Sequence, residues 1–220
     1  MFDADPILPA GGDSDSELVP LHDREYRVRA FRTPDGNLLV RGAVRDQKPP
    51  GLYFADDPEP MVIHHMQVDL TVTLHKMTIV AADVRFLTNP HTTCPKVAAD
   101  YSNLVGLSIT RGFTHKVREL FGGPRGCSHT TALLQAMGPV AVQSIWSLTA
   151  LDMRKAGEPM FVGPNRQEPV EQRMKRVASN LNTCHVWAEG GEHIDAIRDG
   201  SAALPLFALN RMRKLGHSLD

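Results

Sequence analysis

The stretch from residue 61 to residue 75 is the feature that most constrains how this chain can fold. Apolar and polar side chains alternate there almost without interruption. A period of two places alternate side chains on opposite faces of a strand, so the pattern predicts a long β-strand with one covered face. The covered face would carry Val62, His64, Met66, Val68, Leu70, Val72 and Leu74.

Two flanking segments supply further strands. Residues 25–46 alternate on both sides of a Pro34-Asp35-Gly36-Asn37 cluster, which is typical of a strand, a turn and a second strand. Residues 77–87 read as the hairpin partner of the long strand. A proline-rich connection from Gln47 to Pro60 separates the first two strands from the long one. About four strands in this order predict one mainly antiparallel sheet over residues 25–87, with one face covered.

The pattern changes to helical spacing near Pro95, a residue that suits the first turn of a helix. The sequence therefore predicts an α+β fold in which helices of the C-terminal half pack on one face of the sheet. We expect residues 1–20 to form a flexible arm and residues 21–220 to form a single domain. Helices are predicted over 95–106, 113–121, 128–154, 168–180 and 204–215, with a short hairpin over 186–197 that turns at Gly190-Gly191.

Composition excludes several classes of protein. The formal net charge of -1 at pH 7 argues against a general binder of nucleic acid or anionic membranes, which normally has a basic excess. No apolar run approaches the roughly 18 residues of a membrane span, and the acidic N-terminus lacks the features of a signal peptide. Together with an odd count of 3 Cys, these features lead us to expect a soluble cytoplasmic protein with reduced thiols.

Each cysteine has a histidine within three positions, and thiolate and imidazole are ligands that zinc and iron prefer. No CxxC knuckle is present, and a buried cysteine often serves only as a small apolar side chain. Cys94 and Cys127 also lie where helices are predicted to begin, which favours the thiolate form. The pairs are His91 with Cys94, Cys127 with His129, and Cys184 with His185.

His64 is anomalous because it falls on the apolar face of the predicted strand. A buried imidazole needs a hydrogen-bond partner, and a histidine near neutrality suits general acid–base catalysis. A core histidine bonded to a backbone carbonyl is the alternative. Asp46 and Lys48 follow a predicted strand end, where we expect a surface ion pair. The loop before Cys127 could hold an anion on its backbone N–H groups with Arg125 beside it, or serve only as a tight turn.

Several stretches together resemble the bacterial family known as domain of unknown function 2889. They are Ile63-His64-His65-Met66, residues 104–113, residues 120–130 and Asn182-Thr183-Cys184. The resemblance spans roughly residues 24–195, and the family pattern has Asp where this chain has His65. Members of that family tend to come from bacteria that degrade aromatic and steroid compounds, which implies a catabolic enzyme.

The resemblance leads us to expect a cofactor-independent carbon–carbon lyase, an enzyme of the aldehyde-lyase type. It would act on a small aromatic compound derived from lignin and release formaldehyde by a retro-aldol step. Such a reaction needs a base to deprotonate a hydroxyl and a cation to stabilise a phenolate. His64 or His129 would be the base, and Lys48, Arg111 or Arg125 would supply the positive charge.

Two other functions stay open at this point. The first is a metal or iron–sulfur scaffold that binds zinc or iron through Cys94, Cys127, His129 and Cys184. It is favoured by a loose similarity of layout to iron–sulfur cluster scaffold proteins. The second is a hydrolase of acyl compounds with Cys127 as nucleophile and His129 as base, although residues two apart at a helix start need not face each other. The expected partner is a small aromatic substrate, with no nucleic acid or membrane, and a homodimer is left open.

Overall fold

The computed structural model describes residues 17–110, 112–158, 160–161 and 168–217. The chain divides into two compact units, Met1–Leu148 and Thr149–Asp220. Within the described residues, no helix is both long and apolar enough to cross a bilayer.

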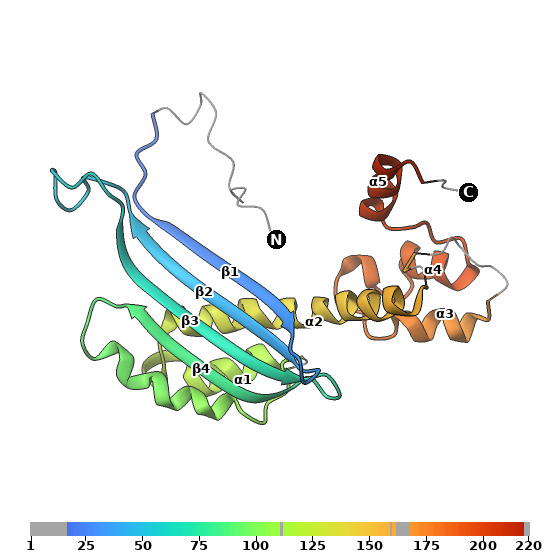
Figure 1. The fold of residues 1–220 in the computed structure, drawn as a ribbon, viewed down its shortest axis with the longest axis horizontal. Coiled ribbons are helices and arrows are strands. Elements are labelled where there is room, and N and C mark those ends of the chain that lie inside the picture. Colours follow the sequence, from blue (N-terminus) through green and yellow to red (C-terminus); the bar gives the residue numbers. More distant parts are fainter. Residues whose placement is uncertain (1–16, 111, 159, 162–167, 218–220) are drawn as a thin grey trace. The chain divides into compact units, whose positions relative to one another are not determined.

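The first unit is built on a four-stranded antiparallel sheet in the order β1-β2-β3-β4, as the sequence predicts (Figure 1). The strands are β1 (Asp23–Arg32), β2 (Leu38–Lys48), β3 (Met61–Thr73) and β4 (Thr78–Thr88). Each strand pairs with the next one along the chain, so the sheet is a simple meander. The expected mainly antiparallel sheet and the α+β class are both confirmed.

The helices of the first unit cover one face of this sheet. They are the 3-10 helix η2 (Cys94–Leu104), α1 (Phe113–Phe121), the short 3-10 turn η3 (Gly123–Arg125) and the beginning of α2 (Ser128–Ala156). The segment after Pro95 is thus a 3-10 helix where helical spacing alone predicts an ordinary helix. The core between the two layers contains Val40, Val44, Met66, Val68, Leu70, Val72, Tyr101, Leu104, Phe113, Val117, Phe121, Leu133 and Met137.

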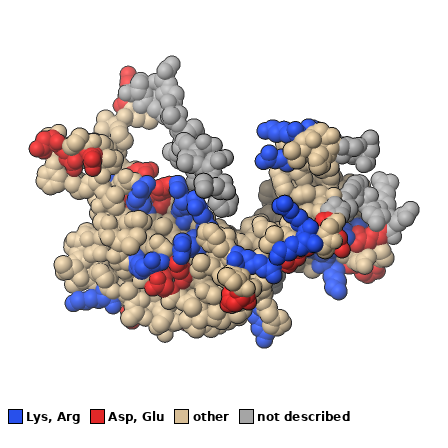
Figure 2. All heavy atoms as spheres, in the orientation of Figure 1, with Lys and Arg blue, Asp and Glu red and all other residues tan. Residues whose placement is uncertain are grey.

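The opposite face of the sheet carries ion-paired side chains. Asp69 on β3 accepts hydrogen bonds from Arg41 on β2 and from Arg85 on β4. Figure 2 shows basic and acidic side chains interleaved over the sheet. The strict alternation of the sequence is therefore a true division between a packed face and a solvated face.

The second unit contains the last part of α2 and the helices α3 (Val170–Val177), α4 (Glu192–Asp199) and α5 (Leu206–Leu215), with the short 3-10 turn η4 (His185–Trp187). The hairpin predicted over residues 186–197 is wrong, because that segment is η4 followed by α4. Gly191 stands at the N-cap of α4 with φ −84°, so the glycine pair starts a helix. The arm expected over residues 1–20 lies largely outside the described residues, and the single-domain expectation stays a prediction.

Candidate functional site

Two neighbouring strands bring a carboxylate and an imidazole together at one end of the sheet. Asp46 on β2 lies directly across the ladder from His64 on β3, and the register shifts between Asp46 and Gln47. Directly opposed residues share a face of the sheet. His64 Nδ1 lies 3.1 Å from Asp46 Oδ2, and only 1% of the Asp46 side chain is exposed.

The first turn of α2 contributes a second imidazole. His129 Nε2 also lies 3.1 Å from Asp46 Oδ2, and its ring stacks on the ring of His64 with centroids 3.9 Å apart. The start of α2 is held by the hydroxyl of Tyr101, which accepts a hydrogen bond from the backbone N–H of Cys127 at 2.9 Å. The neighbouring Gly126 has no room for a side chain, since a Cβ there would lie 2.7 Å from the carbonyl oxygen of Phe121.

Arg24 on β1 completes the surroundings of the carboxylate. Its guanidinium donates from Nε to Oδ1 of Asp46 at 2.6 Å and from Nη2 to Oδ2 at 2.7 Å, a bidentate arrangement that adds strength and orientation. Burial alone would raise the pKa of Asp46. The hydrogen bonds and charge of Arg24, aided by His129 and His22, outweigh burial and lower that pKa to about 2. Asp46 is therefore ionised throughout the neutral range.

An ionised carboxylate only accepts hydrogen bonds, so each ring nitrogen that faces it must carry a proton. His64 therefore donates from Nδ1, and in the neutral ring its Nε2 has a free lone pair. Among the described residues, no group is hydrogen-bonded to Nε2 of His64, and about one fifth of that side chain is exposed. His64 thus presents an available basic nitrogen.

His129 is placed differently because both of its ring nitrogens have partners. Nε2 faces Asp46, and Nδ1 lies 3.7 Å from the Sγ atom of Cys127. Burial, together with the nearby charges of His64 and Arg24, lowers the pKa of His129. Cys127 and His129 are therefore in contact, although residues two apart at a helix start need not face each other.

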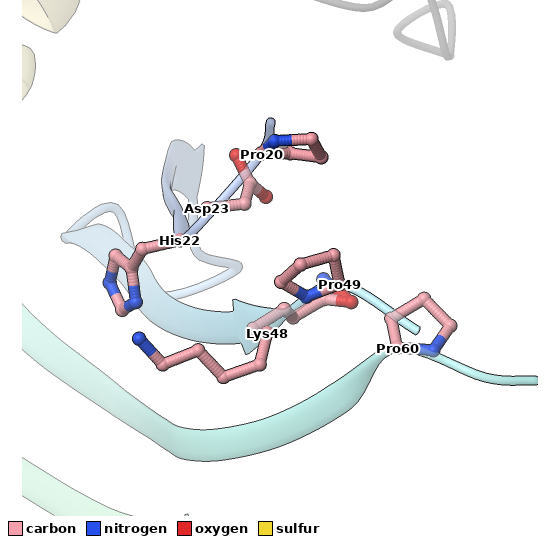
Figure 3. Close-up of a pocket in the computed structure, with 7 residues that line it drawn as sticks. Pro20, His22, Asp23, Lys48, Pro49 and Pro60 are labelled. Atoms are coloured by element: carbon pink, nitrogen blue, oxygen red, sulfur yellow. The ribbon is translucent and has the colours of Figure 1, made fainter. Parts of the chain in front are cut away.

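We name Asp46, His64, His129 and Arg24 the Asp46 cluster. A pocket with a volume of about 340 Å³ opens beside it. His22 connects the two features, since it lines the pocket and its Nε2 lies 3.6 Å from Oδ1 of Asp46. Figure 3 shows the side chain of Lys48 extending toward the ring of His22. The described residues therefore provide both a basic nitrogen and a neighbouring cavity.

The other residues predicted from the sequence have varied positions. Lys48 lines the pocket, whereas Arg125 donates hydrogen bonds to the backbone carbonyls of Glu119 and Arg118, a position that satisfies the end of α1. Arg111 lies outside the described residues. Cys94 is half-buried at the start of η2, and Cys184 is exposed beside η4 in the second unit.

Arg24 is the member of the cluster that the sequence did not point to, and Asp46 was expected at the surface. The surface ion pair expected at Asp46 is wrong, because the carboxylate is buried and its cation comes from β1. A signal was present in the alternation of Leu38, Val40 and Val44. Extended by two residues, it places Asp46 on the covered face.

The same residues also form a potential metal site. One oxygen of Asp46 and one nitrogen each of His64 and His129 lie within 4.8 Å of one another. Three potential metal ligands thus converge at this point of the described structure. Two imidazoles and a carboxylate suit zinc or iron. Arg24 argues against a metal ion here, because its guanidinium already donates a hydrogen bond to each oxygen of Asp46 and its positive charge would repel the ion.

A family model described as protein of unknown function (DUF2889) matches residues 22–143. The chain belongs to this family. The family resemblance inferred from the sequence motifs is thereby confirmed over residues 22–143, whereas the Asn182-Thr183-Cys184 motif lies outside the matched segment. The matched DUF2889 segment contains every member of the Asp46 cluster, together with His22 and Cys127. No curated protein and no solved structure matches the chain. The description of this family names no activity, and the evidence on function therefore comes from the site.

Proposed function

We propose that this protein is an acid–base enzyme in which His64 is the general base. The observation that supports the proposal is the pairing of a buried, ionised carboxylate with an imidazole whose second nitrogen is available. A carboxylate that holds Nδ1–H fixes the tautomer and orientation of the ring and stabilises the imidazolium that forms when Nε2 takes a proton. Arg24 keeps the carboxylate ionised for this role.

The geometry favours His64 over His129 as the base. The Nδ1 atom of His129 faces the thiol of Cys127, and its lowered pKa makes it a weaker proton acceptor. His129 instead stacks on His64 and shares the same carboxylate oxygen. We assign to it the role of a positioning residue.

The reaction that we propose is a retro-aldol cleavage of a hydroxymethyl side chain on a small aromatic compound. His64 Nε2 removes the proton of the primary hydroxyl, the C–O bond becomes a carbonyl, and the adjacent C–C bond breaks to release formaldehyde. Before this step the imidazolium form of His64 protonates the ring carbon that carries the side chain, which gives a dienone. The electron pair of the broken C–C bond then restores the aromatic ring as a phenolate, and His64 ends the cycle as the imidazolium again. This sequence needs no external oxidant or cofactor. The aromatic, lignin-derived substrate class rests on the family resemblance and not on the site.

The test compares single substitutions by the rate of formaldehyde release from hydroxymethyl aromatic compounds. His64→Asn keeps a hydrogen-bonding side chain beside Asp46 and should lower turnover about 10²–10⁴-fold, the usual share of acid–base catalysis. His129→Asn should cause a smaller loss. His65→Asn is the matched control, because His65 is the next residue on the same strand and points to the other face. Equal turnover of the His64 and His65 variants would overturn the assignment of the base.

The metal site is a second candidate function, favoured by the convergence of Asp46, His64 and His129. A zinc or iron ion held there would replace His64 as the reactive group. Metal analysis of freshly purified protein and activity after treatment with a chelator separate the two proposals. Stoichiometric metal, with activity lost on chelation and restored by zinc or iron(II), would replace the general-base proposal by a metal-dependent one.

The contact between Cys127 and His129 favours a third candidate, a thiol-dependent hydrolase of acyl compounds. Cys127→Ser leaves the Asp46 cluster intact and changes only the thiol. The general-base proposal expects this variant to retain most of its formaldehyde release. Loss of activity toward activated esters in the Cys127→Ser variant, with activity unchanged in His64→Asn, would instead support the hydrolase.

A further inference from the structure

The pocket beside the Asp46 cluster is lined by residues that do not belong to that cluster. It is framed by the residues that lead into β1 and by both ends of the connection between β2 and β3. Its volume of about 340 Å³ is near the lower end of the range for small-molecule pockets. A single substituted aromatic ring is the size of ligand that such a volume accommodates. The residues that line it are Pro20, His22, Asp23, Gln47, Lys48, Pro49 and Pro60.

The apolar part of the lining is made of proline rings. Figure 3 shows Pro49 and Pro60 on one side and Pro20 on the other, at the edges of the cavity. A proline ring offers a rigid apolar surface that costs no side-chain entropy when a ligand packs on it. The ring of Tyr53 lies nearby, with its centroid 5.9 Å from the Nζ atom of Lys48. These surfaces fit a flat, apolar ligand.

The charged part of the lining is Lys48. Its ammonium group donates a hydrogen bond to the carbonyl oxygen of Leu21 at 3.3 Å, and among the described residues no carboxylate lies within ion-pair distance of it. The one carboxylate that lines the pocket, Asp23, is drawn beside Pro20, whereas the amine of Lys48 extends toward His22 (Figure 3). A half-buried lysine without a carboxylate partner is suited to pair with an anion from outside the chain.

We propose that this pocket binds an aromatic ring bearing an anionic oxygen, either a phenolate or a carboxylate, and that Lys48 pairs with that oxygen. The assignment of this anion as the substrate rests on the proposed function; its binding does not. His22 borders both the pocket and Asp46, so a ligand seated against Lys48 lies next to the cluster that contains His64. In the proposed lyase reaction, Lys48 stabilises the phenolate that forms when the electron pair of the broken bond returns to the ring.

The test measures the affinity of unreactive ligands for the full chain by isothermal titration calorimetry. The probes are 4-nitrophenolate, benzoate and the neutral compound anisole, at a pH at which both acids are ionised. Lys48→Met preserves the aliphatic stem and removes the charge, and it should weaken binding of the anions about tenfold or more, as expected for a lost charge-assisted hydrogen bond. Lys48→Arg should recover most of this loss.

Lys76→Met is the matched control, because Lys76 is exposed in the turn between β3 and β4 at the other end of the sheet. Its affinities should equal those of the wild type, and anisole should bind equally to all variants. A larger loss for 4-nitrophenolate than for benzoate identifies the anion as a phenolate, and the reverse identifies a carboxylate. Unchanged anion affinity in Lys48→Met, or an equal loss for anisole, would overturn the proposal.

These measurements also separate the pocket from the reaction. His64→Asn should bind all three probes as the wild type does, because His64 does not line the pocket. If the anions bind through Lys48 and no formaldehyde is released from any hydroxymethyl aromatic compound, the pocket stands and the lyase proposal falls. If formaldehyde is released and Lys48→Met changes neither anion affinity nor KM, the lyase stands and the pocket assignment falls.

Discussion

Arg24→Met is the perturbation that most directly tests how the Asp46 cluster is held together. Methionine keeps an aliphatic stem of similar length and removes both hydrogen bonds to Asp46. Only 1% of the Asp46 side chain is exposed in the structure, and His64 and His129 would be the remaining close partners of its carboxylate. We expect the first unit to be destabilised, because a buried charge loses its strongest partner.

The magnitude follows from the pKa of Asp46, which lies at about 2 instead of 3.8. A difference of this size corresponds to about 2 kcal/mol of net stabilisation of the ionised form by all partners together. The two largest contributions that favour the ionised carboxylate both come from Arg24, one from its hydrogen bonds and one from its charge. Loss of one partner from a fully buried pair costs about 3–5 kcal/mol, but 37% of Arg24 is exposed and water screens part of its charge. We therefore expect a cost of about 2 kcal/mol.

The assay is urea unfolding followed by tryptophan fluorescence in a Trp187→Phe background. The chain has 2 Trp. Trp187 lies in the second unit and Trp146 in the part of α2 that belongs to the first, so this background removes the tryptophan of the second unit. Arg41→Met is the matched control, since Arg41 pairs with Asp69 on the solvated face and Asp69 keeps Arg85. It should cost about 0–1 kcal/mol, the usual value of a surface pair.

A double-mutant cycle with Asp46→Asn isolates the pair itself. The coupling free energy between Arg24 and Asp46 should be about 2 kcal/mol, and the double variant should be more stable than the sum of the single effects implies. If Arg24→Met costs no more than Arg41→Met and the coupling free energy is near zero, the carboxylate is not held by Arg24, and the physical basis given for its lowered pKa is wrong.

Two further predictions concern the backbone at α2 and the stability in acid. Gly126→Ala should destabilise the first unit by about 1–3 kcal/mol in urea unfolding, because the new Cβ would lie 2.7 Å from the carbonyl oxygen of Phe121. Gly36→Ala is the comparison, because a Cβ at Gly36 has open space but φ is +85°. It measures the cost of backbone strain without a steric collision. The carboxylate of Asp46 should contribute its full stabilisation above about pH 4 and lose it as the pH falls toward 2. Asp46→Asn should therefore flatten the pH dependence of the unfolding free energy over that window. An unchanged slope would contradict the lowered pKa.

The sheet could be predicted from the sequence because its pattern is local. The alternation around Met66 and Val68 fixes which side chains are buried, and the short turns within the β1–β2 and β3–β4 hairpins fix which strands pair there. The second unit was harder to predict. Gly190 and Gly191 mark a chain reversal in a hairpin and equally a helix start, and only the packing around Ile194, which is fully buried, selects the helix.

The candidate site was predicted only in part, because its assembly depends on contacts between distant segments. His64 stood out by itself, since it interrupts an apolar face. His129 was noticed for its neighbour Cys127, and not for Asp46, which lies 83 positions earlier in the chain. No local pattern links β2 with the start of α2. The pairing appears only when the helix is laid on the sheet.

The crossing of α2 over β2 explains why His129 reaches Asp46. Gly42 has no side chain, and a Cβ there would lie 2.9 Å from the sulfur of Met137 and 3.0 Å from Leu133, so the helix lies close against the strand at this point. Asp46 lies four residues further along β2, or about 13 Å. His129 lies four to eight residues back along α2, or about 6–12 Å. Because helix and strand run in opposite directions (Figure 1), both steps lead from the contact at Gly42 toward the same end of the sheet, where the imidazole meets the carboxylate.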